Sequence, residues 1–501
     1  MSNKKKASLN LLSSIVGQAM AIVIGLVIPR LFIVGYGSAI NGLISSVNQL
    51  LIYLGLFEAG VGTVTLQALY RPVADNDKES INSILAATNT YYKKTGTYYL
   101  FGLIILSFVF PIFTGGEIDF ISTAIIVFSS GIGNVVNFYY QGKYKILLQA
   151  EGKSYVVTNI TSIITVLNGV SKIILLSLKV NVVVVIVIAA LINLLQFFYV
   201  FFYIKKSYAW INLRATPHVQ AIEQKNYVLI HQIAGLIFQN TDILIITVFC
   251  GLREASVYSV YKLVITHIEG IVNILPNSVS FALGQAYHTD IEGFKNKIDA
   301  FEVIYVALVS SVLSVTLYLF VPFVELYTKG ASDIQYVDYI LAIMFVVISL
   351  MTAMRWCMLN TINYAGHFKE TTNRTVIETV INLVTSIVGV YMYGIYGVLF
   401  GTIAALIYRN NDIIIYSNCK LLNRSPIKTF SIHGVNVVIL IVLQFIYPVL
   451  FGSIDNFFIF IIYGLILTVI TLIVFACINL AIYKDIQIMA KELLNKFLKK
   501  E

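Results

Sequence analysis

The sequence predicts an all-α polytopic membrane protein of about 14 transmembrane helices. Three observations support this: the shortage of charged residues, the regular return of long apolar segments, and the one-sided placement of Lys and Arg. Of the 501 residues, 58% are hydrophobic and 12% are charged, whereas an ordinary globular protein is about half apolar and about a quarter charged. So few charged groups cannot cover a soluble surface, but helices that face lipid need none. The chain therefore has no room for a soluble catalytic domain.

Apolar segments of transmembrane length recur along the whole chain, since about 20 apolar residues cross the hydrocarbon core once. We expect spans at 9–35, 39–64, 95–113, 121–140, 156–178, 182–204, 228–249, 255–277, 302–323, 337–359, 375–393, 396–417, 432–450 and 457–482. The third and ninth spans are expected to begin earlier, as helices that rise from the cytoplasm. The first is too long for a signal peptide and lacks a small-residue cleavage site, so we expect it to be retained.

Lys and Arg lie mostly on one side of these predicted spans. Of the 34 basic residues, 26 lie in the two tails or in connections on the side of the N-terminus, and three lie on the opposite side. The positive-inside rule then places both termini in the cytoplasm, in the inner (cell) membrane, with an even number of helices. The net charge of +9 is therefore a topology signal, and no nucleic-acid partner is expected.

An internal repeat divides the chain. Thr158–Val170 matches Thr372–Val384 at eight of 13 positions with an offset of 214, and Gly152 matches Gly366 just upstream. The same offset carries the fifth span onto the eleventh, which predicts two pseudo-symmetric six-helix lobes in the same orientation. The predicted parts are an N-lobe at 1–210, a C-lobe at 211–425, an appended helix pair at 426–483 and a cytoplasmic tail at 484–501. Apolar residues at helical spacing among lysines predict an amphipathic helix for the tail.

Ionisable groups inside spans are costly and usually face a bundle interior or a wet cavity. Here they share helix faces with amides and hydroxyls, which predicts a hydrophilic surface inside the bundle. The residues expected to contact substrate are Arg30, Lys172, Lys262, Arg355, Asn41, Asn48, Asn168, Gln239 and Tyr258. The residues expected to act as counter-ions or to bind a coupling ion are Glu58, Asp242, Glu269 and Glu378. The alternative is that these polar groups only hydrogen-bond helices together.

Motifs for catalysis are absent. The sequence has no HExxH, GxSxG, Walker A or paired CxxC motif, and its four cysteines lack the spacing of a disulfide framework or a metal site. We therefore expect no enzyme activity, no cofactor and no metal.

Two stretches resemble a known family of exporters. Pro29–Gly37 followed by Gly55–Gly62 resembles the opening of the polysaccharide-transporter branch of the multidrug/oligosaccharidyl-lipid/polysaccharide exporter superfamily. The stretch that begins at Asp242 and continues to Gly251 and Tyr258 resembles the start of that family's second lobe. A basic residue in the first span belongs to the family pattern, and Arg30 matches it.

The resemblance implies a Wzx-type flippase that moves undecaprenyl-diphosphate-linked oligosaccharides from the inner to the outer leaflet by alternating access. Its partners would be this lipid carrier, membrane lipids and a coupling ion, H⁺ or Na⁺, and its product would be a surface polysaccharide such as capsule or exopolysaccharide. Three alternatives stay open: a drug/cation antiporter of the same superfamily, a lipid II flippase, and a membrane-embedded polysaccharide polymerase or glycosyltransferase.

Overall fold

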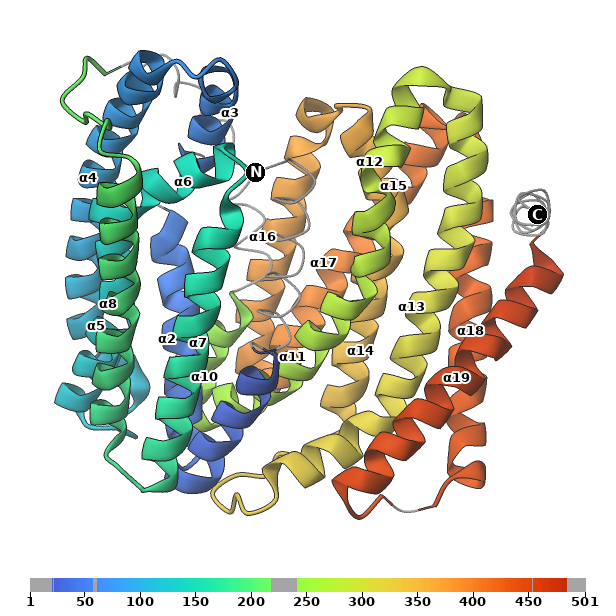
Figure 1. The fold of residues 1–501 in the computed structure, drawn as a ribbon. Helices are drawn as coiled ribbons and strands as arrows, with labels where there is room; N and C mark the ends of the chain where they lie inside the picture. The colour runs from blue at the N-terminus through green and yellow to red at the C-terminus, as the bar shows by residue number, and fades with distance from the viewer. Residues whose placement is uncertain (1–19, 21, 57–60, 218–240, 453, 484–501) are drawn as a thin grey trace. The chain divides into compact units, whose positions relative to one another are not determined.

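The computed structural model describes residues 20, 22–56, 61–217, 241–452 and 454–483, and every regular element in these ranges is a helix (Figure 1). The predicted all-α membrane fold is therefore confirmed for the part of the chain that is described. In chain order the helices are Ile22–Tyr36, α2 (Ser38–Gly55), α3 (Val61–Ala74), α4 (Lys78–Val109), α5 (Phe120–Val136), α6 (Gly142–Ala150), α7 (Ser154–Ser177), α8 (Val182–Ser207), α10 (Asp242–Cys250), α11 (Leu252–Val272), α12 (Ile274–Thr289), α13 (Ile291–Thr328), α14 (Tyr339–Met354), α15 (Trp356–Tyr364), α16 (Phe368–Tyr393), α17 (Ile395–Tyr416), α18 (Ile427–Leu450) and α19 (Phe457–Ile482).

Ten helical stretches in the described ranges are long and apolar enough to cross a membrane, and they coincide with predicted spans three to six and nine to fourteen. The remaining four predicted spans fall on the helix Ile22–Tyr36, α2, α10 and α11, which do not reach that length and hydropathy where they are described. The count of 14 therefore stays a prediction. As expected for the third and ninth spans, α4 and α13 begin well before their apolar parts, at Lys78 and Ile291.

The chain forms two compact units. The first unit comprises Met1–Ser259 with Gly330–Ile334, and the second comprises Val260–Lys329 with Gln335–Glu501. The division passes through α11, after Ser259. The lobes predicted from the repeat, with their boundary between residues 210 and 211, stay a prediction. The predicted tail helix at 484–501 lies outside the described residues, as do the candidate site residues Glu58 and Gln239.

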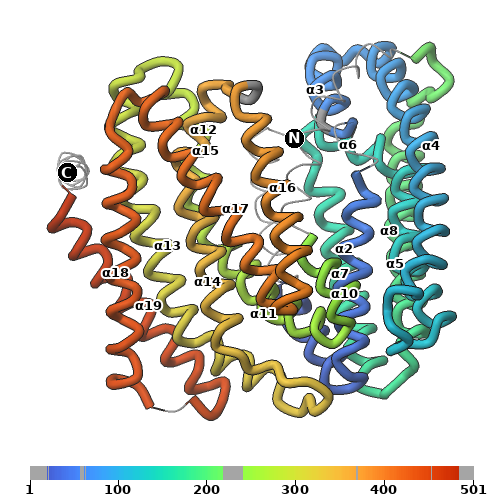
Figure 2. The backbone as a smooth tube through the Cα atoms, turned by 180° about the vertical axis from the view of Figure 1, so that it is seen from behind, coloured from blue at the N-terminus to red at the C-terminus, as the bar shows by residue number. Residues whose placement is uncertain are grey.

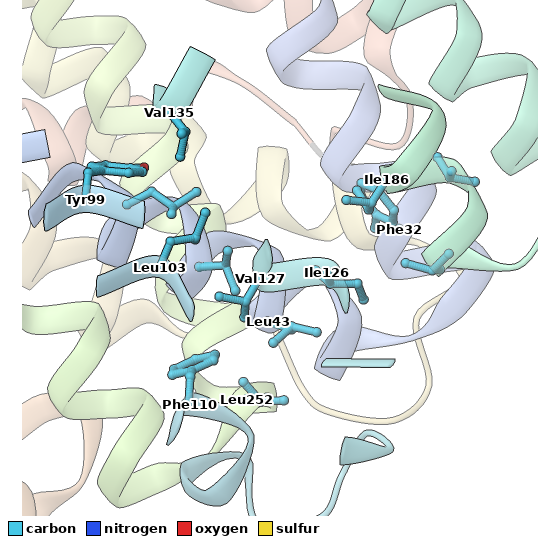
Figure 3. Close-up of a cluster of buried hydrophobic side chains, with 14 of the residues drawn as sticks. Phe32, Leu43, Tyr99, Leu103, Phe110, Ile126, Val127, Val135, Ile186 and Leu252 are labelled. Atoms are coloured by element: carbon cyan, nitrogen blue, oxygen red, sulfur yellow. The ribbon is translucent and has the colours of Figure 1, made fainter. Parts of the chain in front are cut away.

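A buried apolar cluster holds the first unit together. Phe32, Leu43, Leu103, Ile126 and Leu252 belong to it and are each no more than 1% exposed (Figure 3). These side chains come from the helix Ile22–Tyr36, α2, α4, α5 and α11, so residues about 200 positions apart share one core. In lipid this packing stabilises the unit through van der Waals contacts, because no hydrophobic driving force acts between helices there. The cluster therefore fixes the angle at which α2 meets the start of α11.

The sequence repeat has a structural counterpart. Gly152 and Gly366 both adopt a positive φ, 69° and 70°, which an L-residue with a Cβ disfavours. Each is followed two residues later by a long helix, α7 at Ser154 and α16 at Phe368, so the helix starts keep the offset of 214. The helix α8 follows α7, and α17 follows α16. The first turn after the glycine is thus built in the same way at both places.

The second unit is organised around α13, which packs against α12, α14, α18 and α19. In the same unit α16 and α17 cross at very close range, and α17 also packs against α14 (Figures 1 and 2). A Cβ at Gly389 would lie 2.6 Å from the carbonyl oxygen of Gly397, and one at Gly397 would lie 2.0 Å from that of Gly389. Only glycine allows two backbones to come this close, as is common where helices pack in lipid.

Candidate functional site

The helix Ile22–Tyr36 and α7 run side by side in the same direction. A Cβ at Gly169 would lie 2.6 Å from Ile24 Cδ1, and the Tyr36 hydroxyl donates to the carbonyl oxygen of Val180 at 2.7 Å. Arg30 and Lys172 lie between these two contacts on their helices. At about 1.5 Å of rise per residue they lie at the same depth to within about one helical turn. The structure therefore brings two of the predicted cations to one level.

A polar strip runs along α7 and α8. It consists of Thr161, Asn168 and Lys172 on α7 with Asn193 and Gln196 on α8. The Asn168 amide donates to Asn193 Oδ1 at 2.6 Å, and the Gln196 amide donates to Thr161 Oγ1 at 2.9 Å. Thr161 and Asn193 are exposed although both helices are apolar enough to cross a membrane. Because an exposed amide is costly against lipid, the strip is expected to face water or a polar ligand.

Two atoms of this strip keep free hydrogen-bonding capacity. The Asn168 Oδ1 is buried and has no hydrogen-bond partner among the residues that the structure describes. Lys172 lies one turn further along α7, half-buried, and no described carboxylate lies within ion-pair distance of it. An ammonium group offers three donors and an amide oxygen two lone pairs. A ligand with both anionic and hydroxyl groups would satisfy both. Asn193 and Gln196 were missed by the sequence analysis, although their spacing of three residues in an apolar span was a usable signal.

A second polar group, the α2 seam, joins α2 to α10 and α11 within the first unit. The Asn41 amide is 2% exposed and donates to the hydroxyls of Ser256 at 2.8 Å and Ser259 at 3.0 Å. Ser46 and Thr247 share a hydrogen bond of 2.6 Å. The Asn41 amide is thus occupied by helix-to-helix contacts. Asn48, on the same helix, is exposed.

The acidic side chain of Glu117 contacts the start of α11, at one end of the α2 seam. Glu117 accepts a hydrogen bond from the backbone N–H of Leu252, at the first turn of α11, at 3.0 Å. It also forms an ion pair with Arg253 at 3.1 Å. A carboxylate at a helix N-terminus is favoured by the exposed N–H groups and the helix dipole. The contact fixes the start of α11 against the loop before α5.

Asp242 and Tyr258 lie together at the start of α10. Each is 5% exposed, and the Tyr258 hydroxyl donates to Asp242 Oδ2 at 3.3 Å. Asp242 occupies the first turn of its helix, where a negative charge is favoured. Beside this pair, Tyr53 and Thr241 share a hydrogen bond of 2.7 Å. The predicted acid and the predicted substrate-binding tyrosine are therefore in contact with each other.

The second unit contains a network of three guanidinium groups and two carboxylates. Arg355, at the junction of α14 and α15, donates to Glu378 Oε1 at 2.7 Å. Arg409 on α17 pairs with Glu378 Oε2 at 3.5 Å and with Asp412 Oδ2 at 2.5 Å. Arg374 pairs with the other oxygen of Asp412. Both oxygens of each carboxylate thus face a guanidinium, and the role of Glu378 as a counter-ion stays a prediction.

Sequence spacing placed Arg355 and Glu378 as separate candidates, and it did not identify Arg409 as a second partner of Glu378 or Asp412 as a partner of Arg374 and Arg409. The remaining candidates, Lys262 and Glu269, lie two turns apart on the part of α11 in the second unit. Both are half-buried, and no described residue forms an ion pair with either.

The fold is similar to solved structures of exporters. Lipid II flippase MurJ in an inward closed conformation aligns over 93% of this chain and 98% of its own, with a TM-score of 0.68 and 14% sequence identity. A multidrug resistance MATE family transporter of the MOP superfamily, in an inward-facing conformation, aligns over 80% and 98%, with a TM-score of 0.60 and 13% identity. A MATE in a bent conformation aligns over 87% and 98%, with a TM-score of 0.52 and 13% identity.

No family model matches the sequence, and no curated protein matches it. The likeness to solved structures therefore rests on the arrangement of helices rather than on residue identity. Together with the ten apolar helices of transmembrane length in the described ranges, it shows a multi-pass membrane protein with the fold of these transporters.

Proposed function

We propose that this chain is a flippase for oligosaccharides linked to undecaprenyl diphosphate, and that it moves them between leaflets by alternating access to supply a surface polysaccharide. The observation that supports this most directly is the exposed polar strip on α7 and α8 with Lys172 at its end. A lipid-linked sugar requires cations for the diphosphate and amides or hydroxyls for the sugar, while its prenyl tail stays in lipid. The cargo would enter from the cytoplasmic leaflet of the cell membrane, with both termini of the protein in the cytoplasm.

Within this proposal the residues divide by their surroundings. Arg30 and Lys172, at one depth, bind the diphosphate. Asn168 and Asn193 hydrogen-bond sugar hydroxyls, because the buried Asn168 Oδ1 has no partner in the described part of the chain. Asp242 is the candidate for H⁺ or Na⁺ coupling, because it is a buried carboxylate, 5% exposed, in a predicted span, and it accepts a hydrogen bond from the Tyr258 hydroxyl.

Purified protein in liposomes tests the assignment. The Lys172→Met and Arg30→Met variants are compared with the parent for the flipping of fluorescent undecaprenyl-diphosphate oligosaccharide, read by an external quencher. Each charge-assisted hydrogen bond is worth roughly 1.5–3 kcal/mol, so at least about a tenfold slower rate is expected. Lys179→Asn is the matched control, because Lys179 is exposed just after the same helix with a φ of 56° that Asn tolerates. Parent-like rates in both test variants would refute the proposal.

A drug/cation antiporter is the second candidate, and the likeness to MATE structures favours it. A cationic drug would seek a carboxylate without a positive partner. Glu378 is occupied by Arg355 and Arg409, whereas Glu269, like the cation Lys172, has no ion pair among the described residues. An anionic cargo is favoured by the two cations Arg30 and Lys172 at one depth, with the amides of the polar strip beside Lys172. Sodium- or proton-driven dye efflux in the same liposomes, with no flipping of lipid-linked sugar, would reverse this choice.

A lipid II flippase would use the same diphosphate contacts. Competition between lipid II and a lipid-linked oligosaccharide that lacks the peptide separates the two cargoes, because the diphosphate and the prenyl chain are common to both. We expect the oligosaccharide to compete at least as well as lipid II.

A further inference from the structure

Lys143 is a buried cation outside the polar strip. It is the second residue of α6 and is 3% exposed. Its Nζ donates to the backbone carbonyl oxygen of Tyr139 at 2.9 Å and lies 5.0 Å from the centre of the Tyr144 ring. In the described ranges no carboxylate lies within ion-pair distance of it. An ammonium group has three donors, and burial of an unneutralised charge among membrane helices is costly. A bound anion would neutralise this charge and accept hydrogen bonds from the ammonium group.

The local structure explains how a lysine comes to be buried here. The helix that begins with α5 continues through a π-helical segment, Asn137–Gln141, directly into α6. A Cβ at Gly142 would lie 2.4 Å from Tyr92 Cε2, so only glycine lets α6 begin this close to α4. The next residue, Lys143, is thereby held at the junction of α4 and α6. Extra residues of this π type are frequent at functional sites.

Other positive and polar groups surround the junction. Lys93, exposed on α4, follows Tyr92, whose ring lies against Gly142. The Lys145 Nζ donates to Asn137 Oδ1 at 2.8 Å. Gln141 is 4% exposed, and its Oε1 is buried without a hydrogen-bond partner. Rotation of that amide by 180° would present its NH₂ group, a donor that an anion can accept. The group of charges extends from the interior to the surface, because Lys93 is exposed.

We propose that this junction binds the phosphate group of a resident anionic membrane lipid, with Lys143 as the buried contact and Lys93 and Lys145 around it. A lipid rather than a free ion is favoured by the neighbours, since Tyr98 on α4 is 51% exposed and Tyr140 is 54% exposed. Exposed aromatic rings are typical of the membrane interface. Basic pockets between transmembrane helices on the cytoplasmic side bind anionic headgroups elsewhere, and the distribution of Lys and Arg predicts that side for this junction. The inference does not depend on the cargo of the proposed flippase.

The experiment measures the melting temperature of the purified full chain in neutral detergent, with added phosphatidylglycerol or phosphatidylcholine. Phosphatidylglycerol is expected to raise it and phosphatidylcholine is not. In Lys143→Met the apparent affinity for phosphatidylglycerol is expected to fall by about tenfold or more, because a charge-assisted hydrogen bond is lost. Lys143→Arg should keep the response. Lys205→Met, which removes an exposed charge at the end of α8, should keep it as well. Equal losses in Lys143→Met and Lys205→Met would show diffuse surface attraction and overturn the proposal.

Lipid-free protein separates the remaining explanations. Removal of an unneutralised buried charge should leave the melting temperature of Lys143→Met unchanged or higher than that of the parent. If lipid-free Lys143→Met and Glu58→Gln both melt at clearly lower temperature than the parent, a carboxylate outside the described residues neutralises Lys143. That result would overturn the proposed lipid site. Inorganic phosphate that reproduces the full shift would refute the lipid assignment. A shift given by undecaprenyl diphosphate but not by phosphatidylglycerol would assign the site to cargo and refute a resident lipid.

Discussion

Replacement of Gly42 by alanine tests the closest helix contact in the α2 seam. A Cβ at Gly42 would lie 1.8 Å from the carbonyl oxygen of Leu252 and 2.7 Å from its carbon. Both partners are backbone atoms, so no side chain can rotate away, and α2 must separate from the start of α11. A separation of roughly 1.5 Å would bring the new Cβ and the carbonyl oxygen of Leu252 to an ordinary van der Waals distance. The alanine variant should therefore open the seam.

The hydrogen bonds that the α2 seam would lose give the expected size of the shift toward the open state. Asn41 donates at 2.8 Å and 3.0 Å, and Ser46 bonds to Thr247 at 2.6 Å. All three exceed ordinary hydrogen-bond length after such a separation. In membrane proteins each is worth about 0.6 kcal/mol on average, so the three together contribute about 2 kcal/mol. The equilibrium between closed and open seam should shift roughly 30-fold toward the open state.

Spin labels at Ile52 and Val248 report on the seam without touching it, because both side chains are exposed, one on α2 and the other on α10. In a cysteine-free background we expect Gly42→Ala to add a population at longer distance in pulsed electron resonance. Gly35→Ala is the control, since a Cβ there meets nothing within 4 Å. Identical distance distributions for Gly42→Ala and the parent would refute the close backbone contact on which the argument rests.

Two further changes test contacts in the second unit. Glu378→Gln should destabilise the protein by about 3–5 kcal/mol, because it removes the buried carboxylate that both Arg355 and Arg409 face. The melting temperature should fall well below that of Glu370→Gln, an exposed acid on the same helix. The buried amides of Asn436 and Asn479 donate to each other, at 3.1 Å and 2.9 Å, and join α18 to α19. Asn479→Leu should cost about 1–3 kcal/mol by leaving one amide unsatisfied, and Asn436→Leu added to it should recover most of that loss. A purely additive double variant would contradict this pairing.

Hydrophobic length predicted most helices well, because the thickness of the hydrocarbon core fixes it. The predicted span 156–178 corresponds to α7, Ser154–Ser177, and the predicted span 182–204 corresponds to α8, Val182–Ser207. Interruptions were harder to predict. The span predicted at 255–277 is interrupted at Asn273, where α11 ends and α12 begins. The span predicted at 337–359 is likewise divided at Arg355 into α14 and α15. Apolar periodicity is the same on both sides of such a break, so it carries no sign of it.

Contacts across the sequence explain what the site prediction missed. Helical spacing puts Thr161, Asn168 and Lys172 on one face, but it does not say that Asn193 lies opposite Asn168. Lys143 was counted among the basic residues of a cytoplasmic connection. The structure buries it instead, because the helix continues through the π-helical segment to Ala150. Charge counts along a sequence predict topology well but do not show which cation lies in the interior.

The most buried cations of the two units have different surroundings, and this difference points to where an anionic ligand would bind. In the second unit Arg355, Arg374 and Arg409 face the carboxylates of Glu378 and Asp412, so these charges fix α14, α16 and α17 against one another. In the first unit Lys143 and Lys172 have no acidic partner within the described ranges. A buried cation persists without a counter-ion only at a considerable cost in stability, which a bound anion would offset. Anion recognition is therefore expected at Lys143 and Lys172 in the first unit, while the three paired arginines of the second unit hold its helices in place.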